Sequence, residues 1–211
     1  LDMSGEGGLL WLKQRAGSGS SSHILLDTVR GANKTVKTNT NGAETTVTWG
    51  QTFTTTGFTL NNSFNDTNAN NETYASWSFR MAKGFFDIVT YTGTGSKRTV
   101  SHNLGCQPGM IAVKRTDGTG DWEVWHKALG GTGSDFYWLR LNSTMAASTT
   151  STRFGDWPAD SPTSTAFTVG TAGDTNGSGS SYVAYLFAGG ESTAATARSV
   201  EFDGNDYLTL A

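Results

Sequence analysis

Short runs in which apolar and polar residues alternate, or in which β-branched and aromatic residues cluster, recur along the whole chain. Such runs are typical of β-strands with one buried face. No apolar stripe at helical spacing lasts beyond a turn or two, so long helices are not expected. The predicted strands cover residues 9–13, 24–26, 45–49, 57–60, 74–79, 85–92, 110–114, 122–126, 136–141, 166–169 and 182–187.

Polar loops rich in Gly, Ser, Thr and Asn separate these runs. Among the longest are 17–22, 61–71 and 173–181, and their residue types are those that favour turns. Strands that recur about every ten residues between such loops are typical of sandwich folds. We therefore expect an all-β protein made of tandem β-sandwich-like modules with long loops.

The two halves of the chain carry the same motifs in the same order. Residues 8–15 match 109–115, with basic residues after an apolar run both times. Further matches join 23–31 to 122–130, 34–39 to 137–142, 57–60 to 166–169 and 74–79 to 182–187. The offset of about 100 residues is the size of a domain and not of a solenoid repeat. The repeat predicts a first β-module over 1–83, a second over 84–190, and a linker with the start of a lectin-like β-domain over 191–211.

The second unit has opening segments that the first unit lacks. Residues 84–93 and 100–105 precede the second copy and have no counterpart before Gly8. We expect the first module to lack its opening strands and its edge to be filled by upstream chain or by a neighbouring chain, because an unfilled edge invites aggregation. The chain starts at Leu1 and stops at Ala211 within a strand-like pattern, so we expect a fragment of a longer polypeptide.

Composition narrows the classes of function. A formal charge of −3 gives no basic field for phosphate backbones, so nucleic acid is not an expected partner. Charged residues make up 16% of the chain and Ser with Thr roughly a quarter, a balance that suits an extracellular or virion surface. Seven Trp, eleven Phe and six Tyr indicate a packed core and not disorder. Without an apolar run of about 18 residues, membrane insertion is not expected.

The densest aromatic patch is Trp122-Glu-Val-Trp-His126, followed by Tyr137-Trp138. Aromatic faces stack on sugar rings and polar neighbours bond hydroxyls, which makes a glycan site chemically reasonable. The candidate contacts are Trp122, Trp125, His126, Trp138 and Arg140. Alternation puts Trp122, Val124 and His126 on one strand face and Glu123 with Trp125 on the other, and one of these faces must be core. Core packing is favoured about three to one, since Trp is usually buried.

Catalytic and metal motifs are weak. Three carboxylate pairs, Asp121 with Glu123, Asp156 with Asp160 and Asp203 with Asp206, lie where Asp is an ordinary turn residue. Asp203-Gly-Asn-Asp206 lacks the spacing of a calcium loop. His23, His102 and His126 have no partner at metal-ligand spacing, and the single Cys106 is typical of a packed small hydrophobe. We expect no enzyme, no metal site and no cofactor.

Several of these motifs resemble a module found in tail-fibre and other appendage proteins of marine and cyanobacterial bacteriophages. The resemblance is carried by Phe86–Gly95, Val100–Gly105, Pro108–Arg115 and Asp121–His126, and by Gly8–Arg15, Leu26–Gly31, Gly57–Phe58 and Ala75–Arg80. The segment Val200–Leu208 is similar to the opening of laminin-G or concanavalin-like lectin sandwiches. The resemblance implies a structural protein of the virion and brings with it no catalytic or ligand residues.

The leading hypothesis is therefore a structural component of a bacteriophage tail fibre or related appendage on the outer virion surface. It would serve as shaft or spacer and contribute to host attachment. The expected partners are further copies of the chain, other virion proteins and, as a candidate, a host-surface glycan. The alternatives are a glycan-binding module in its own right, a capsid-surface decoration protein, and a depolymerase domain of a tail spike.

Overall fold

The computed structural model describes residues 1–17, 21–48, 51–61, 64 and 66–189. Within them the chain forms sixteen strands and three short helices, so the prediction of an all-β fold is confirmed. None of these helices has the length and apolar character needed to cross a membrane. The first half contains β1 (Gly8–Ala16), β2 (Ile24–Asp27), β3 (Gly31–Lys37), β4 (Thr45–Thr46), β5 (Thr52–Thr54), β6 (Gly57–Thr59) and β7 (Thr73–Arg80).

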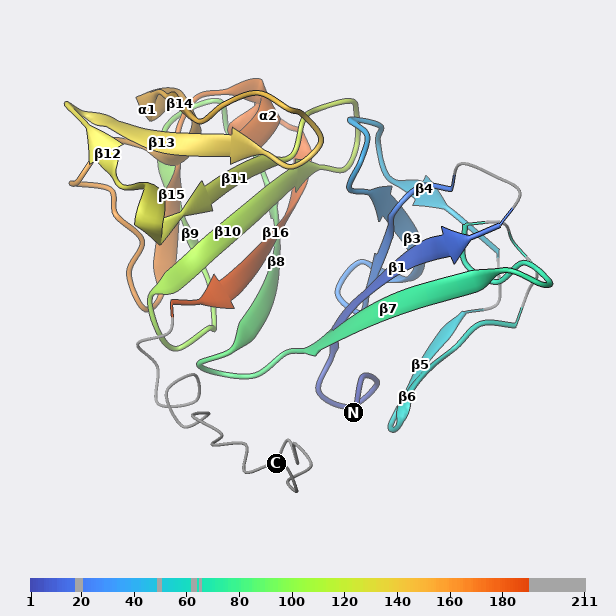
Figure 1. Cartoon of the computed structure of the whole chain (residues 1–211). Coiled ribbons are helices and arrows are strands. Elements are labelled where there is room, and N and C mark those ends of the chain that lie inside the picture. Colours follow the sequence, from blue (N-terminus) through green and yellow to red (C-terminus); the bar gives the residue numbers. More distant parts are fainter. Residues whose placement is uncertain (18–20, 49–50, 62–63, 65, 190–211) are drawn as a thin grey trace, which may run out of the picture.

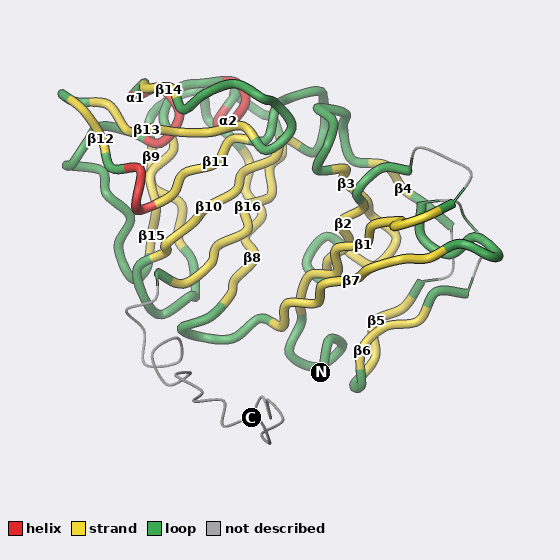
Figure 2. The backbone as a smooth tube through the Cα atoms, in the orientation of Figure 1, coloured by secondary structure: helices red, strands yellow, loops and turns green. Residues whose placement is uncertain are grey.

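The second half holds the remaining strands and all the helices described. They are β8 (Phe86–Thr92), β9 (Arg98–Ser101), β10 (Pro108–Arg115), β11 (Glu123–His126), η1 (Lys127–Leu129), β12 (Gly131–Thr132), β13 (Asp135–Arg140), β14 (Ser148–Thr149), α1 (Ser151–Phe154), β15 (Ala166–Val169), α2 (Gly173–Asn176) and β16 (Ser181–Ala188). Figure 2 shows how little of the backbone is helical.

Two antiparallel sheets form the two main layers (Figure 1). The first sheet has the order β4-β3-β2-β1-β7. The second has the order β12-β13-β11-β10-β16-β8, with β14 beside β13. The run β3-β2-β1-β7 of the first sheet therefore corresponds, strand by strand, to the run β13-β11-β10-β16 of the second. These are the strands that the matched motifs predict to be equivalent, so the sequence repeat is also a repeat of topology.

The two sheets differ at the edge where the second unit has extra sequence. β8 pairs with β16 over seven residues, from Ser181 opposite Thr92 to Phe187 opposite Phe86. In the first sheet the equivalent strand, β7, is the last of its order, and no strand of the described residues pairs with its outer edge. The second extra strand, β9, pairs with β15, whereas its place in the first unit is taken by the β5–β6 hairpin.

A hydrophobic core, here called the shared core, lies between the two sheets. Its buried members come from both: Leu9, Leu25, Val36, Phe86, Ile88, Ala112, Trp122, Val124, Val183 and Tyr185. Fully burying one such aliphatic or aromatic side chain contributes about 1.5–3 kcal/mol. The predicted boundary at 83 lies between β7 and β8, and residues from both sides of it pack together here. The division into two modules stays a prediction, and 191–211 lies outside the described residues.

Equivalent faces of the two repeat units meet in this shared core. Leu25 of β2 and its repeat partner Val124 of β11 are both members. In the same way, Leu9 matches Met110, Val36 matches Leu139 and Phe79 matches Phe187. In each pair the first residue contacts the shared core from the first sheet, and the second residue contacts it from the second sheet. The two units are therefore packed like the halves of a symmetric dimer that has been joined into one chain.

Each sheet is also covered on its other face. Leu10, Leu12, Ile24 and Leu26 pack under Phe53, Phe58 and Leu60 of the β5–β6 region. Beneath the second sheet a larger outer core contains Ile111, Val113, Trp125, Phe136, Trp138, Phe154 and Phe167. Strands such as β10 are consequently buried on both faces, which explains their nearly continuous apolar sequences.

Candidate functional site

The five candidate glycan contacts do not form one site. Trp122 packs in the shared core with 1% of its surface exposed. Trp125 and Trp138 lie on the opposite face of the sheet in the outer core, with 3% and 4% exposed. His126 is exposed at the end of β11, and Arg140 is half-buried in an ion-pair network.

The alternation predicted for this strand is confirmed, but both of its faces are core, because the second sheet lies between two layers. A tryptophan buried to this extent has no ring face free to stack on a sugar. We therefore correct the assignment of Trp122, Trp125 and Trp138 from ligand contacts to packing residues. Of the five candidates, His126 keeps an exposed side chain.

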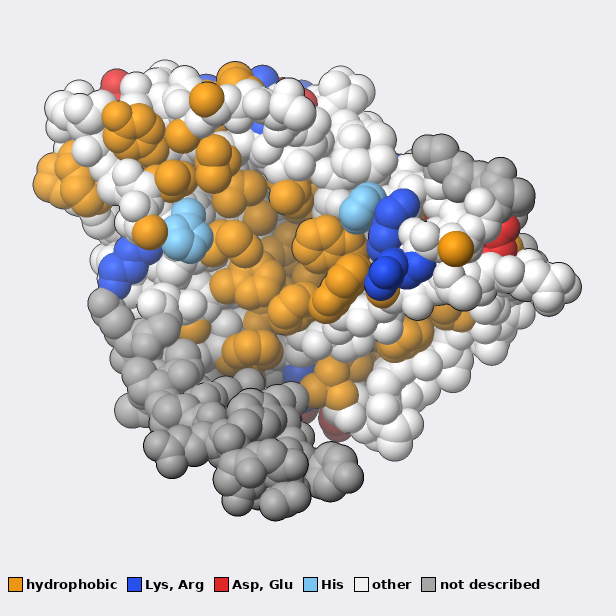
Figure 3. All heavy atoms as spheres, in the orientation of Figure 1, with side chains coloured by type: hydrophobic (Ala, Val, Ile, Leu, Met, Phe, Trp, Pro, Cys, Tyr) orange, Lys and Arg blue, Asp and Glu red, His pale blue; other side chains and the backbone are white. Residues whose placement is uncertain are grey.

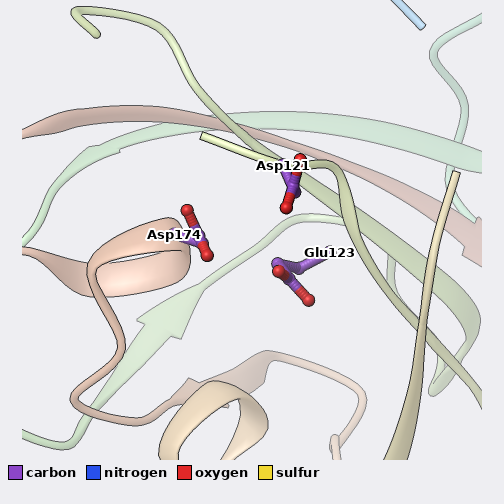
Figure 4. Close-up of side chains that lie close together, drawn as sticks. All are labelled: Asp121, Glu123 and Asp174. Atoms are coloured by element: carbon purple, nitrogen blue, oxygen red, sulfur yellow. The ribbon is translucent and has the colours of Figure 1, made fainter. Parts of the chain in front are cut away.

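A cluster of three carboxylates lies at the end of the second sheet (Figure 4). Asp121, Glu123 and Asp174 bring oxygens within 4.8 Å of one another, a spacing that fits a metal ion. Three cations share the same space and balance these charges: Arg140, Arg153 and Lys114. We call these six residues the charged cluster. The three positive charges match the three negative ones, so each carboxylate of the cluster already has a cationic partner.

The geometry of the charged cluster centres on Glu123, whose side chain is fully buried. Its two oxygens lie 3.2 Å from Nε of Arg140 and 2.8 Å from Nε of Arg153; only the first contact is aligned as a hydrogen bond. Burial raises the pKa of Glu123, and the two arginines oppose that rise. The guanidinium of Arg153 stacks over Trp138 at 3.7 Å, which gives this buried indole a structural role.

Lys114 is the third cation and has no exposed surface. Its Nζ donates to the carbonyl of Arg115 at 2.7 Å and to that of Asn41 at 3.3 Å. Burial lowers the pKa of Lys114 to about 8, and nearby Asp174 and Asp121 oppose the fall. Since Asn41 belongs to the first unit, this lysine also ties the two repeat units together.

A second buried polar group closes one side of the shared core, and we call it the closed corner. The hydroxyl of Tyr185 in the second sheet donates to Oδ2 of Asp27 in the first at 2.7 Å. Arg30 pairs with the same carboxylate at 2.5 Å and with Glu44 at 3.0 Å. Burial raises the pKa of Tyr185 well above its ordinary value. Asp27 and Arg30 stand in the Leu26–Gly31 motif, where sequence alone gave no sign of this contact.

On the other side the two sheets leave an open groove. A cavity of about 100 Å³ is lined by apolar side chains that include Trp11, Met110, Leu141 and Phe187. It adjoins a wider hollow of about 600 Å³, which shares Met110 and Phe187 and reaches His126. Figure 3 shows the hydrophobic side chains gathered between the two layers.

An exposed tryptophan stands beside the open groove. The ring of Trp77, 48% exposed, lies 5.9 Å from the ring of Trp11 in an edge-on contact. The ring of His23 also lies near Trp11, with 6.2 Å between the two ring centroids. Trp77 is the largest of the exposed hydrophobic side chains among the described residues. No sequence pattern indicated a role for Trp11 or Trp77, because Trp11 is the single aromatic residue of β1 and the aromatic residues of β7 are spaced two or three positions apart.

The repeat relates the closed corner to the open groove. Tyr185 is the counterpart of Trp77, and Asp27 is the counterpart of His126. Tyr185 and Asp27 form a hydrogen bond across the sheets. The residues at the equivalent positions of the repeat are Trp77 and His126, which lie at the open groove. The contact between the two sheets is therefore closed at one of the two equivalent positions and open at the other.

The fold and this junction define a class: an all-β protein of two repeated sheets that share one core and leave an apolar groove between them. The chain belongs to the family described as Domain of unknown function (DUF7483), whose sequence pattern matches residues 3–198. No curated protein matches the chain, and no solved structure matches it either. The family match spans both repeat units together, as does the shared core.

Proposed function

We propose that this protein is a structural component of a bacteriophage virion appendage, where it acts as a spacer and contributes to host attachment. The observation that carries the proposal is the shared core, in which equivalent faces of two repeated sheets are packed together. A spacer must transmit force without shearing between its units. A continuous core with buried polar ties across it supplies that rigidity.

The polar ties support a mechanical role. The closed corner joins residues 158 positions apart through the Tyr185–Asp27 hydrogen bond. The indole nitrogen of Trp122 donates to the carbonyl of Lys37 at 2.8 Å, and the amide of Glu44 donates to the carbonyl of Thr116 at 2.9 Å. These bonds fix the two sheets in one relative orientation, because sliding either sheet would leave buried polar groups without partners.

The carboxylate pairs considered for catalysis are engaged in ion pairs. Asp121 and Glu123 are both held by Arg140. Asp156 and Asp160 are bridged by Nζ of Lys97 at 2.7 and 2.9 Å. The third pair, 203 and 206, lies outside the described residues. These contacts favour a non-enzymatic protein, since a general acid and base need carboxylates that face a substrate.

The experiment that tests the proposal is localisation in the particle. Antibodies raised against the folded 211-residue chain should label fibres or spikes of purified virions from the phage that encodes it, seen by electron microscopy. Mass spectrometry of the same particles should detect the protein at structural copy number. Labelling of the capsid would support the decoration alternative instead. Absence of the protein from purified particles would refute both.

The open groove favours a second candidate function, glycan binding. Trp77 presents an exposed ring beside Trp11, and His126 supplies a polar group at the adjoining hollow. A glycan array probed with the wild type and with Trp77→Ala tests this. Val29→Ala, which trims an exposed hydrophobic side chain in the β2–β3 turn, is the matched control. Binding that survives Trp77→Ala, or no binding by the wild type, removes this candidate.

A further inference from the structure

The two long edge strands of the described residues differ in how their outward backbone groups are bonded. The short strands β4, β12 and β14 have two residues each, whereas β7 has eight and β8 has seven. Several outward backbone groups of β8 are bonded within the chain. Phe86 exchanges hydrogen bonds with Ala82, the amide of Ile88 donates to Asp87, and the carbonyl of Thr92 accepts from Arg98. These bonds occupy part of the β8 edge.

The outward groups of β7 can be identified from its pairing with β1. The amide of Met81 donates to the carbonyl of Gly7, so odd-numbered residues of this strand direct their backbone groups towards β1. Ser76 and Ser78 therefore direct theirs outward. Within the part of the chain that the structure describes, no hydrogen bond reaches the backbone groups of these two serines.

β7 also lacks the features that usually block such an edge. Its sequence, Thr-Tyr-Ala-Ser-Trp-Ser-Phe-Arg, contains no proline and no lysine. Proline, lysine, bulges and short length are the common means by which edge strands avoid pairing. Trp77, at the middle of β7, adds exposed aromatic surface. The outward backbone groups of Ser76 and Ser78, which are unbonded within the described residues, can accept hydrogen bonds from and donate them to an added strand.

The repeat shows what kind of strand this position accepts. The equivalent strand β16 carries β8 on its outer edge in antiparallel orientation. Two copies of one edge strand related by a two-fold axis are antiparallel as well. We propose that β7 pairs with β7 of a second copy of this chain, which joins the two first sheets into one continuous sheet.

The sequence of β7 is self-complementary in one register. With the two-fold axis at Ser76, the half-exposed Trp77 lies opposite Ala75 of the second copy, which leaves room for the indole. In this register the outward-directed backbone groups of Ser76 face those of Ser76 in the second copy, as hydrogen-bonded antiparallel pairs require.

This inference goes beyond the proposed function and does not depend on where the protein acts. If the chain is absent from virions but pairs through β7, the proposed function fails and the inference stands. If it is found in virions and is monomeric, the inference alone fails.

The test is sedimentation velocity of the 211-residue chain over a wide concentration range, with the wild type and two proline variants. Ser76→Pro removes an outward amide from β7 and leaves its pairing with β1 intact. Thr46→Pro is the matched control on the opposite edge of the same sheet. The amide of Val47 donates to the carbonyl of Asn33, so the amide of Thr46 faces outward from β4.

We expect the wild type to dimerise, Ser76→Pro to raise the dimer Kd by at least about tenfold, and Thr46→Pro to leave it within about twofold. Circular dichroism checks that each variant is folded. If Ser76→Pro does not fold, Ser76→Lys decides, because an edge lysine blocks pairing without changing the backbone. A wild type that is monomeric throughout, or a dimer unaffected by Ser76→Pro or Ser76→Lys, overturns the proposal.

Discussion

The closed corner and the open groove are the same junction of a duplicated unit, and the closed corner carries a hydrogen bond across the sheets. At the closed corner, Tyr185 reaches Asp27 across the sheets and Arg30 neutralises that carboxylate. At the open groove, the equivalent residues Trp77 and His126 remain exposed. The comparison teaches that duplication supplied the packing faces, whereas a few substitutions decided which side is a joint and which side is a surface.

The largest difference between the two sides should appear when the equivalent residues Asp27 and His126 are removed in turn. Asp27→Ala leaves Arg30 buried without its main partner and Tyr185 without an acceptor. Breaking a buried ion pair in this way costs about 3–5 kcal/mol of unfolding free energy. His126→Ala removes a side chain that accepts a hydrogen bond from the amide of Ala128, and should cost less than about 1 kcal/mol.

Urea unfolding of both variants, followed by tryptophan fluorescence, measures these costs. If the two substitutions lower the unfolding free energy equally, the closed corner contributes no more stability than the open groove.

The second prediction concerns Lys114 and its repeat counterpart Lys13. Lys114 is fully buried with a pKa lowered to about 8, whereas Lys13 is half-buried. Between pH 8 and the ordinary value of 10.5 the unfolded chain binds more protons at Lys114 than the folded chain does. Stability should therefore rise with pH in that window, by roughly 2 kcal/mol from about pH 7 to about pH 9.5.

The measurement is the urea midpoint as a function of pH. Lys114→Gln should abolish the rise, and Lys13→Gln serves as the matched control that should keep it. If stability still rises with pH in Lys114→Gln, another titrating group causes the rise.

The third prediction compares the hydroxyl of Tyr185 with the indole of Trp77. Tyr185→Phe removes the buried hydrogen bond to the Asp27 carboxylate and should lower the unfolding free energy by about 1.5–3 kcal/mol. Trp77→Phe trims an exposed ring and should change it by less than about 0.5 kcal/mol. Thermal unfolding of the two variants at low protein concentration gives the comparison. A larger loss for Trp77→Phe would show that the open groove is closed in solution.

The smallest effect is expected from calcium. Glu123 has Ile24 as its counterpart in the first unit, so the charged cluster belongs to the second unit alone. Because Arg140, Arg153 and Lys114 already balance its carboxylates, added calcium should shift the Tm by less than about 1 °C, since only a bound ligand stabilises the folded state. Differential scanning calorimetry with calcium and with a chelator tests this. A clear upward shift of the Tm with calcium would show that the charged cluster binds the ion.

Much of the fold could be predicted from local pattern. Period-two alternation located β11, a short run of apolar and aromatic residues located β16, and the repeat identified equivalent strands before their pairing was seen. Residues 84–93 have no counterpart in the first unit of this sequence, which predicted an additional strand in the second unit, and β8 is that strand. Local pattern suffices here because side chains on a strand alternate between faces wherever the strand is placed.

The candidate site could not be predicted in the same way. Trp122 and Trp125 stand in the densest aromatic run, for which the sequence favoured core packing and left a ligand surface open as the alternative. Alternation shows that they point to opposite faces, but not that another layer covers both. Trp11 and Trp77 come from strands more than sixty residues apart, and their contact exists because β1 pairs with β7.

The sequence by itself determined that this protein is all-β, that its strand motifs are duplicated, and that the side chains of a strand such as β11 alternate between its two faces. Only the tertiary structure decided that the two apolar faces cover each other, that Asp27 meets Tyr185, and that Trp77 remains exposed. The physical reason is that the period of a strand is a local property of the backbone. The partner of a buried face is set by packing and by polar satisfaction between residues far apart in the chain.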